Sequence, residues 1–184
     1  MMHSKDDVRK NLLLMMKDLC YKKGEFKLSS GKTSEHYINC KPVTLSSWGL
    51  SLVCPLMVEH LEEDTKSVGG LTLGADPLVA GVALAALLQE KPIDAMIVRK
   101  EPKGHGTGAW IEGPVKPAGS KITVLEDVIT TGGSVLKAVE KLRDAGYTVQ
   151  RVVSIVDRKE HDPFTFLDAG LELVSLFTIE DFNE

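Results

Sequence analysis

Two adjacent carboxylates, Glu126 and Asp127, stand between an apolar run and a loop of small residues. The run, Ile122–Leu125, is rich in apolar and β-branched residues, which is typical of a buried parallel strand. A helical pattern begins after the loop, and backbone N–H groups at such a junction favour a phosphate. The order of residues therefore predicts a phosphate site beside two acids. The loop consists of Thr130, Thr131, Gly132, Gly133 and Ser134.

The paired acids suit a sugar, because ionised carboxylates accept hydrogen bonds from neighbouring hydroxyls. Successive side chains on a strand point to opposite faces, so we expect the chain to leave the strand at Glu126-Asp127. The plain alternative is a pair of surface acids at a strand end. The loop has no Walker A motif, which requires a lysine after the glycine. Acids and loop together favour a sugar phosphate over the plain alternative.

A second unusual segment, Arg99–Gly113, combines cations with glycines. It could be an ordinary solvated loop. A long structureless loop in a compact domain is, however, usually either functional or disordered. Cations on a lid suit a polyphosphate leaving group, whose negative charge grows as its bond breaks. The candidate cations are Arg99, Lys100, Lys103 and His105.

From Ser67 onward, apolar runs alternate with helical patterns. This alternation predicts an α/β fold with a mostly parallel central sheet flanked by helices. Ligands of such sheets bind outside the carboxyl ends of the strands. Asp76 before Pro77 resembles a helix cap followed by proline at the first helical position. The segments expected along this edge of the sheet are 74–76, 99–103, 126–134 and 157–158.

The first 45 residues contain strand-like pieces too short for such a sheet. We expect 1–45 to build a small N-terminal hood and 46–184 to form the core of one domain spanning 1–184. His3, His60 and His161 fall at a terminus, on a predicted helix and in a loop, and we assign them no functional role.

Composition narrows the class of protein. A net charge of −4, with 43% hydrophobic and 26% charged residues, is ordinary for a globular protein and speaks against a nucleic-acid or membrane-surface partner. No apolar run is long enough to span a bilayer, and the start lacks the apolar core of a signal peptide. The three cysteines show no CxxC spacing, so we expect a cytoplasmic protein without disulfides or zinc.

Several motifs resemble a known family. Val124–Ser134 resembles the phosphoribosyl pyrophosphate (PRPP) signature of type I phosphoribosyltransferases. Arg99–Gly106 resembles the catalytic loop of the orotate phosphoribosyltransferases within that group. Gly24–Ser34 with Tyr37–Asn39 resembles their N-terminal hood, and Asp157-Arg158 is also in place. The resemblance covers almost the entire chain, and the motifs occur in the family's order.

The resemblance implies an enzyme that transfers ribose 5-phosphate from PRPP to a ring nitrogen of orotate. The products would be orotidine 5′-monophosphate and pyrophosphate, a step of pyrimidine synthesis. By similarity, Glu126 and Asp127 hold the ribose hydroxyls and Thr130–Ser134 cradle the 5′-phosphate. The residues expected to bind pyrophosphate are Arg99, Lys100, Lys103 and His105.

The remaining roles also follow from the resemblance. Lys103, His105 and Asp127 are expected to be catalytic, and Arg158 to contact the orotate carboxylate beneath a hood near Tyr37. Magnesium would be held mainly by substrate oxygens, without a direct protein ligand. The family also implies a homodimer in which the mobile loop closes over the neighbouring subunit's site. Some members carry lysines where this chain has Ser29 and Leu78, so no lysine role is transferred to those positions.

Two alternatives remain open at the level of sequence. One is a phosphoribosyltransferase for another base, such as a purine; the hood motif and the cationic loop favour orotate instead. The other is a nucleotide-sensing regulator that acts on nucleic acid, which would need a basic face or an added recognition domain.

Overall fold

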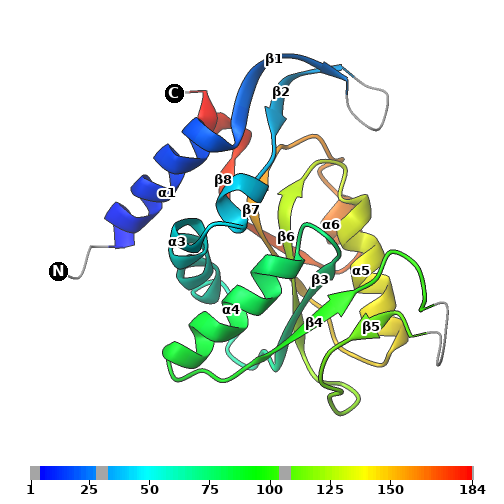
Figure 1. Ribbon diagram of the computed structural model, residues 1–184. Coiled ribbons are helices and arrows are strands. Elements are labelled where there is room, and N and C mark those ends of the chain that lie inside the picture. Colours follow the sequence, from blue (N-terminus) through cyan, green and yellow to red (C-terminus); the bar gives the residue numbers. More distant parts are fainter. Residues whose placement is uncertain (1–4, 28–32, 104–108, 184) are drawn as a thin grey trace.

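The computed structural model describes residues 5–27, 33–103 and 109–183. Six strands form one sheet in the order β5-β4-β3-β6-β7-β8, and a separate hairpin pairs β1 with β2 (Figure 1). All neighbours in the large sheet are parallel except β4 and β5. The strands are β1 (Tyr21–Lys27), β2 (Thr33–Ile38), β3 (Ser67–Leu71), β4 (Asp94–Val98), β5 (Ile111–Glu112), β6 (Ile122–Ile129), β7 (Arg151–Asp157) and β8 (Glu172–Thr178).

Helices cover both faces of the large sheet (Figure 1). The first, third and fourth helices share one hydrophobic cluster with one face, and the fifth packs against the other face in a second cluster. The helices are α1 (Lys5–Leu19), α2 (Lys41–Thr44), α3 (Ser47–Val58), α4 (Asp76–Leu88), α5 (Gly133–Asp144) and α6 (Thr165–Asp168), followed by the 3-10 helix η1 (Ile179–Phe182). None of the helices in these described ranges has the length and apolar character needed to span a bilayer.

The central strand β3 is buried along its whole length and contains Gly69 and Gly70. A Cβ atom on Gly70 would lie 2.3 Å from the Cβ of Ala75 and 2.6 Å from the carbonyl oxygen of Leu125. Glycine is therefore needed for the close approach of β3, the start of α4 and β6. This approach brings the turn after β3 next to the middle of β6.

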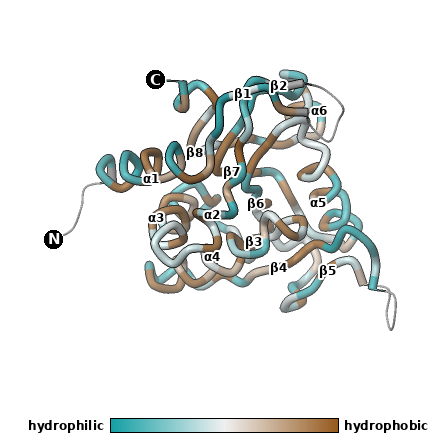
Figure 2. The backbone as a smooth tube through the Cα atoms, turned by 45° about the horizontal axis from the view of Figure 1, so that its top comes forward, coloured by the Kyte–Doolittle hydropathy of each residue, from teal (hydrophilic) through white to brown (hydrophobic). Residues whose placement is uncertain are grey.

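The β1–β2 hairpin is hydrophilic along most of its length, whereas β4 is hydrophobic (Figure 2). The hairpin stands above the end of β6 (Figure 1). Ile38, the last residue of β2, and Cys40, just after it, are buried in the same hydrophobic cluster as α3 and α4. The predicted α/β architecture, with its mostly parallel sheet, is confirmed.

Three local expectations are wrong. β6 does not end at Glu126-Asp127, because its pairing with β7 continues through Val128 and Ile129. The segment after Arg99 is not wholly irregular, since it includes β5, which pairs with β4. The cap of α4 is Ala75; Asp76 is already helical, and its carboxylate accepts a hydrogen bond from the hydroxyl of Thr72 at 2.7 Å.

Candidate active site

The predicted acids and phosphate loop meet at the carboxyl end of β6. Glu126 and the loop Thr130–Ser134 line one small cavity of about 40 Å³. Gly132 has a left-handed φ of 82°, which glycine adopts without strain, and α5 begins at the next residue. The N-terminus of α5 therefore lies at the wall of the cavity that contains Glu126. A helix N-terminus there favours an anion.

Glu126 is buried, with 6% of its surface exposed. Burial, and secondarily the charge of neighbouring Asp127, raises the pKa of its carboxyl group to about 8. Its Oε1 accepts a hydrogen bond from the backbone N–H of Asp127 at 3.1 Å. Near neutral pH the pair therefore holds a proton, so Glu126 can donate a hydrogen bond as well as accept one.

Asp127 faces a different set of residues. Its Oδ2 lies 3.6 Å from the ammonium of Lys41, the first residue of α2. Its Oδ1 accepts a hydrogen bond from the N–H of Val128 at 2.9 Å. A Cβ atom on Gly74 would lie 2.7 Å from the same oxygen. The carboxylate of Asp127 is therefore confined between α2 and the turn that joins β3 to α4.

Arg158 connects the end of β7 to the hairpin. It is buried, and its Nη2 donates hydrogen bonds to the hydroxyl of Ser34 at 2.8 Å and to the carbonyl of His36 at 3.1 Å. It also pairs with Glu160 at 2.5 Å. Tyr37 lies on β2 with 40% of its surface exposed and its ring 5.3 Å from that of Phe26. The residues predicted to meet orotate thus lie on two elements joined by Arg158.

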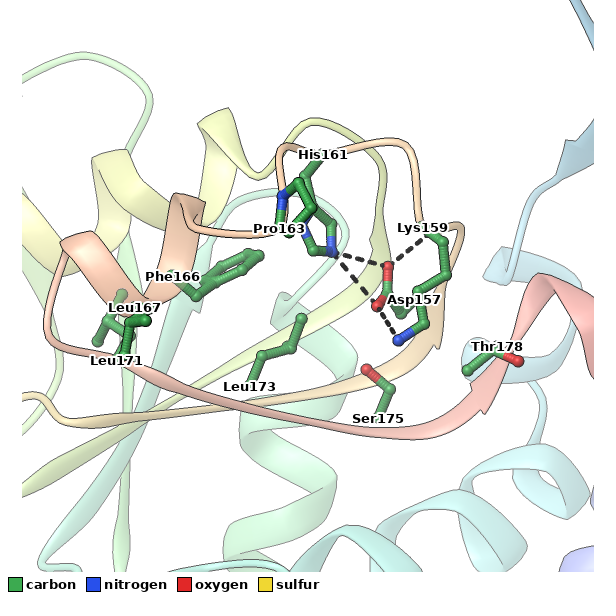
Figure 3. A pocket seen from close by; sticks show the side chains of 10 residues that line it. All are labelled: Asp157, Lys159, His161, Pro163, Phe166, Leu167, Leu171, Leu173, Ser175 and Thr178. Atoms are coloured by element: carbon green, nitrogen blue, oxygen red, sulfur yellow. Dashed lines mark hydrogen bonds and ion pairs between the residues drawn. The ribbon is translucent and has the colours of Figure 1, made fainter.

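Asp157, the last residue of β7, contacts Lys159 and His161 in the turn that follows the strand (Figure 3). Its buried carboxylate accepts a hydrogen bond from the N–H of Lys159 at 2.8 Å and lies 3.2 Å from Nε2 of His161. The ammonium of Lys159 lies 3.4 Å from the same carboxylate. These contacts border a pocket of about 390 Å³ whose other wall includes Phe166 and Leu173. His161, to which the sequence assigned no role, is a structural partner of Asp157.

The cationic segment begins directly after β4. Arg99 Nη1 and Lys103 Nζ lie 3.3 Å and 3.7 Å from the same oxygen of Glu112 on β5. The N–H of Lys103 also donates to the carbonyl of Ala109 at 3.1 Å. Lys100 is exposed, and its carbonyl accepts a hydrogen bond from Lys137 at 2.6 Å. His105 lies outside the described residues.

The structure thus brings the predicted residues together in three groups. Glu126 and the phosphate loop form one, Arg158 and the hairpin a second, and the cations at Glu112 a third. Within the described ranges, the ion-pair partner of Arg99 and Lys103 is Glu112 rather than Glu126 or Asp127.

Sequence reasoning missed the contacts that Lys41 and Gly74 make with Asp127. Gly74 was expected at the correct edge of the sheet, but its contact with Asp127 follows only from the approach of β3 to β6. Lys41 is 86 positions away from Asp127, and no local pattern indicates the pair.

Comparison with known proteins gives close relatives. No family model matches the chain. The orotate phosphoribosyltransferase of Thermosynechococcus vestitus is 53% identical over 175 residues, covering 95% of this chain and 93% of the relative. That of Nostoc sp. is 48% identical over 177 residues, covering 96% and 86%.

The chain belongs to the orotate phosphoribosyltransferase family.

Solved structures agree with this membership. A crystal structure of Mycobacterium tuberculosis orotate phosphoribosyltransferase with Fe(III) dicitrate has a TM-score of 0.83 and 35% identity, covering 96% of this chain and 99% of that one. A structure of the same enzyme in complex with PRPP has a TM-score of 0.79 and 32% identity, with the same coverage. The type I phosphoribosyltransferase fold and the predicted enzyme class are therefore confirmed. The activity is transfer of ribose 5-phosphate from PRPP to orotate.

Proposed function

We propose that the carboxyl edge of β6 holds the ribose 5-phosphate half of PRPP. Glu126 and Asp127 bind the ribose hydroxyls, and Thr130–Ser134 bind the 5′-phosphate. The observation that carries this assignment is the single cavity lined by Glu126 and the loop at the N-terminus of α5. In addition, the position of Asp127 against Gly74 leaves its carboxylate beside the turn after β3.

Pyrophosphate is the part of PRPP that requires cations. We assign it to Arg99, Lys100, Lys103 and His105. Glu112 neutralises Arg99 and Lys103 in the described conformation. Both side chains are about half exposed, so each ion pair is weak and easily exchanged for a phosphate contact. If the segment closed on PRPP, Arg99 and Lys103 would exchange their ion-pair partner Glu112 for the more highly charged pyrophosphate.

Orotate is assigned to the place where the hairpin meets the end of β7. Arg158 would bind the carboxylate of orotate, and Tyr37, on the hood built from 1–45, would cover the base. In support, Arg158 already contacts the hairpin through Ser34 and His36. A guanidinium suits a carboxylate because its donors match the two oxygens.

In the reaction, a ring nitrogen of orotate forms a bond to the anomeric carbon as the bond from that carbon to pyrophosphate breaks. The transition state resembles an oxocarbenium ion. Asp127 and Glu126 fix the ribose, and Lys103 and His105 stabilise the growing charge of the leaving group. The protein therefore acts mainly by positioning, leaving-group stabilisation and exclusion of water.

Magnesium is the proposed cofactor. The nearby protein donors are carboxylate oxygens, which are the hard ligands that this ion accepts, and it usually retains water and substrate phosphates as ligands. In the described residues, no group of three or more His, Cys, Asp or Glu side chains is arranged to hold a metal. We propose that substrate oxygens would hold most of its ligand positions, where the ion would neutralise the pyrophosphate charge.

We also propose a cytoplasmic homodimer in which each loop completes the partner's site. Helix α4 has exposed apolar residues, which include Leu84, Leu87 and Leu88. We propose that a second copy of the chain packs on this face of the helix. Cys20, Cys40 and Cys54 are all free thiols, in keeping with a reducing compartment.

The assigned activity is tested by following the absorbance of orotate after PRPP and magnesium are added. We expect absorbance to fall with orotate and no nucleotide to form when adenine or hypoxanthine replaces it. The variant Arg158→Gln should raise KM for orotate more than KM for PRPP. Turnover of a purine without turnover of orotate would overturn the proposal.

A further inference from the structure

Lys41 stands next to the proposed ribose site but has no part in the reaction as described above. Its ammonium lies 3.6 Å from Oδ2 of Asp127. The backbone around it is fixed, because Val43 and Thr44 of α2 are buried. The thiol of Cys40, the preceding residue, also contacts the carbonyl oxygen of Asp127 at 3.9 Å. Helix α2 is therefore anchored to β6 at the residue whose carboxylate Lys41 faces.

The carboxylate of Asp127 has little freedom on its other sides. Gly74 closes one side, and the N–H of Val128 holds Oδ1. Only 13% of the side chain of Asp127 is exposed, whereas 42% of the side chain of Lys41 is. A half-exposed partner adds little to the stability of the fold. The contact of Lys41 therefore affects the orientation and charge of Asp127 more than the free energy of unfolding.

The charge balance at this position also requires a cation. Glu126 and Asp127 are adjacent acids, and the repulsion between them raises the pKa of Glu126 after the larger effect of burial. Lys41 is the cation that lowers that pKa. The neighbouring turn, residues 72–78, contains Asp76 but no lysine, arginine or histidine. Helix α2 thus supplies the positive charge that the turn after β3 does not.

We propose that Lys41 is a positioning residue for the transfer reaction, which orients the carboxylate of Asp127 toward the ribose hydroxyls of PRPP. The proposal rests on the ribose-binding role assigned to Asp127 above. Lys41 acts through Asp127 and need not touch the substrate. Its loss should therefore change the reaction only while Asp127 is present.

The first test compares Lys41→Met and Lys41→Arg by the pH dependence of kcat/KM for PRPP. For Lys41→Met we expect kcat/KM at pH 7 to fall by about 10- to 100-fold, because the carboxylate loses its orientation. Lys41 lowers the pKa of Glu126, the other acid of the pair. Its removal should therefore move the acid limb of the profile, where activity declines with falling pH, to higher pH. We expect this acid limb to move up by about half to one pH unit.

Lys41→Arg keeps the charge and should restore the position of the acid limb. In the part of the chain that the structure describes, the other titratable groups that interact with Asp127 are Glu126, Cys20 and Cys40. Burial raises the pKa of Cys20 to about 11 and that of Cys40 well above its usual value, so both thiols stay neutral across the acid limb. The shift therefore reports on the two carboxylates.

Lys121→Met is the matched control. Lys121 also pairs with acids, Glu62 at 3.3 Å and Asp64 at 2.9 Å, but these contacts lie at the amino end of β6. The variant Lys121→Met should therefore leave the acid limb at its wild-type pH. Thermal unfolding of each variant identifies a general loss of folding, and Lys41→Gln, which also removes the charge, repeats the test if Lys41→Met unfolds.

The second test uses the background Asp127→Asn. If Lys41 acts through Asp127, adding Lys41→Met to Asp127→Asn should change kcat/KM less than twofold. An independent loss of 10-fold or more in that background would overturn the proposal, as would an unshifted acid limb in Lys41→Met. Wild-type activity in Asp127→Asn alone would instead overturn the proposed function of Asp127, so the two failures are distinguishable.

Discussion

At the scale of residues, the site depends on how charges are placed around buried carboxylates. Glu126 is buried and has a pKa of about 8, whereas Asp127 keeps an ion-pair partner. The two acids are adjacent in sequence but have different surroundings, and burial raises the pKa of Glu126. Glu126 is therefore available as a hydrogen-bond donor near neutral pH and Asp127 as an acceptor.

The raised pKa of Glu126 predicts a pH-dependent stability. The folded protein keeps this proton up to about pH 8, whereas the unfolded chain loses it near the usual value of 4.5. The unfolded state binds fewer protons in that window, so stability falls as pH rises from about 4.5 to 8. Glu126→Gln removes this loss and should raise Tm relative to wild type by roughly 3–8 °C at pH 9, with a smaller difference at pH 5.

The measurement is Tm of both proteins from pH 5 to 9. Glu140→Gln, at an exposed position on α5, is the control and should show a difference from wild type that does not grow with pH. Parallel curves for Glu126→Gln and wild type would show that Glu126 titrates at its ordinary pKa.

Lys103 is predicted to act on the transition state. Its side chain is about half exposed and pairs only weakly with Glu112, so Lys103→Ala should fold normally. We expect kcat to fall by about 100- to 1,000-fold with only a small change in KM for PRPP, because the charge on pyrophosphate grows during bond cleavage. Steady-state kinetics measure this, with the exposed Lys91→Ala as control. A change confined to KM would contradict the assignment.

At the scale of elements, the turn between β3 and α4 shapes the site from the side. Gly74 has room for no side chain, since a Cβ atom there would lie 2.7 Å from Oδ1 of Asp127. The turn contributes space, and α2 contributes the cation Lys41. The position of Asp127 is thus set by two elements other than its own strand.

Gly74→Ala should therefore displace the carboxylate of Asp127. We expect kcat/KM for PRPP to fall by about 10-fold or more, while Tm changes little because the new methyl meets a side chain rather than the core. Leu73→Ala, which truncates an exposed neighbour in the same turn, should stay near wild-type activity. Equal effects of the two variants would mean that Gly74 serves the turn rather than Asp127.

The alternation of apolar runs and helical patterns predicted the central sheet, because each buried strand is apolar by itself. The end of β6 could not be predicted in this way. Its pairing persists past Asp127 because β7 still lies alongside, opposite Val128 and Ile129. Local sequence does not show how far a neighbouring strand extends. The strand β5 was missed for the same reason. It has only two residues, and its pairing with β4 is not visible in its own local sequence.

At the scale of the whole molecule, the site is assembled from contacts between distant parts of the chain. Motifs predicted which residues lie at the carboxyl edge of the sheet. They did not predict that Arg158 contacts Ser34 or that Lys41 contacts Asp127. Such contacts depend on how the hairpin and α2 pack on the sheet, which no short window of sequence contains.

The proposed sharing of each site by two subunits also concerns the whole molecule. In the described conformation, Arg99 and Lys103 pair with Glu112 of their own chain, away from Glu126 and Asp127. A loop that serves the partner's acids would explain why the cations and the acids form separate groups within one subunit. The exposed apolar residues of α4 offer a surface for that partner.

The most direct test mixes inactive Lys103→Ala and Asp127→Ala subunits. In a hybrid dimer, the site of the Lys103→Ala subunit has its own Asp127 and receives Lys103 from its partner. Random mixing makes about half of the dimers hybrid, each with one intact site, so activity should recover to about a quarter of the wild-type value. Subunit exchange is verified with two affinity tags. If hybrids form and activity does not recover, the shared-site account is wrong.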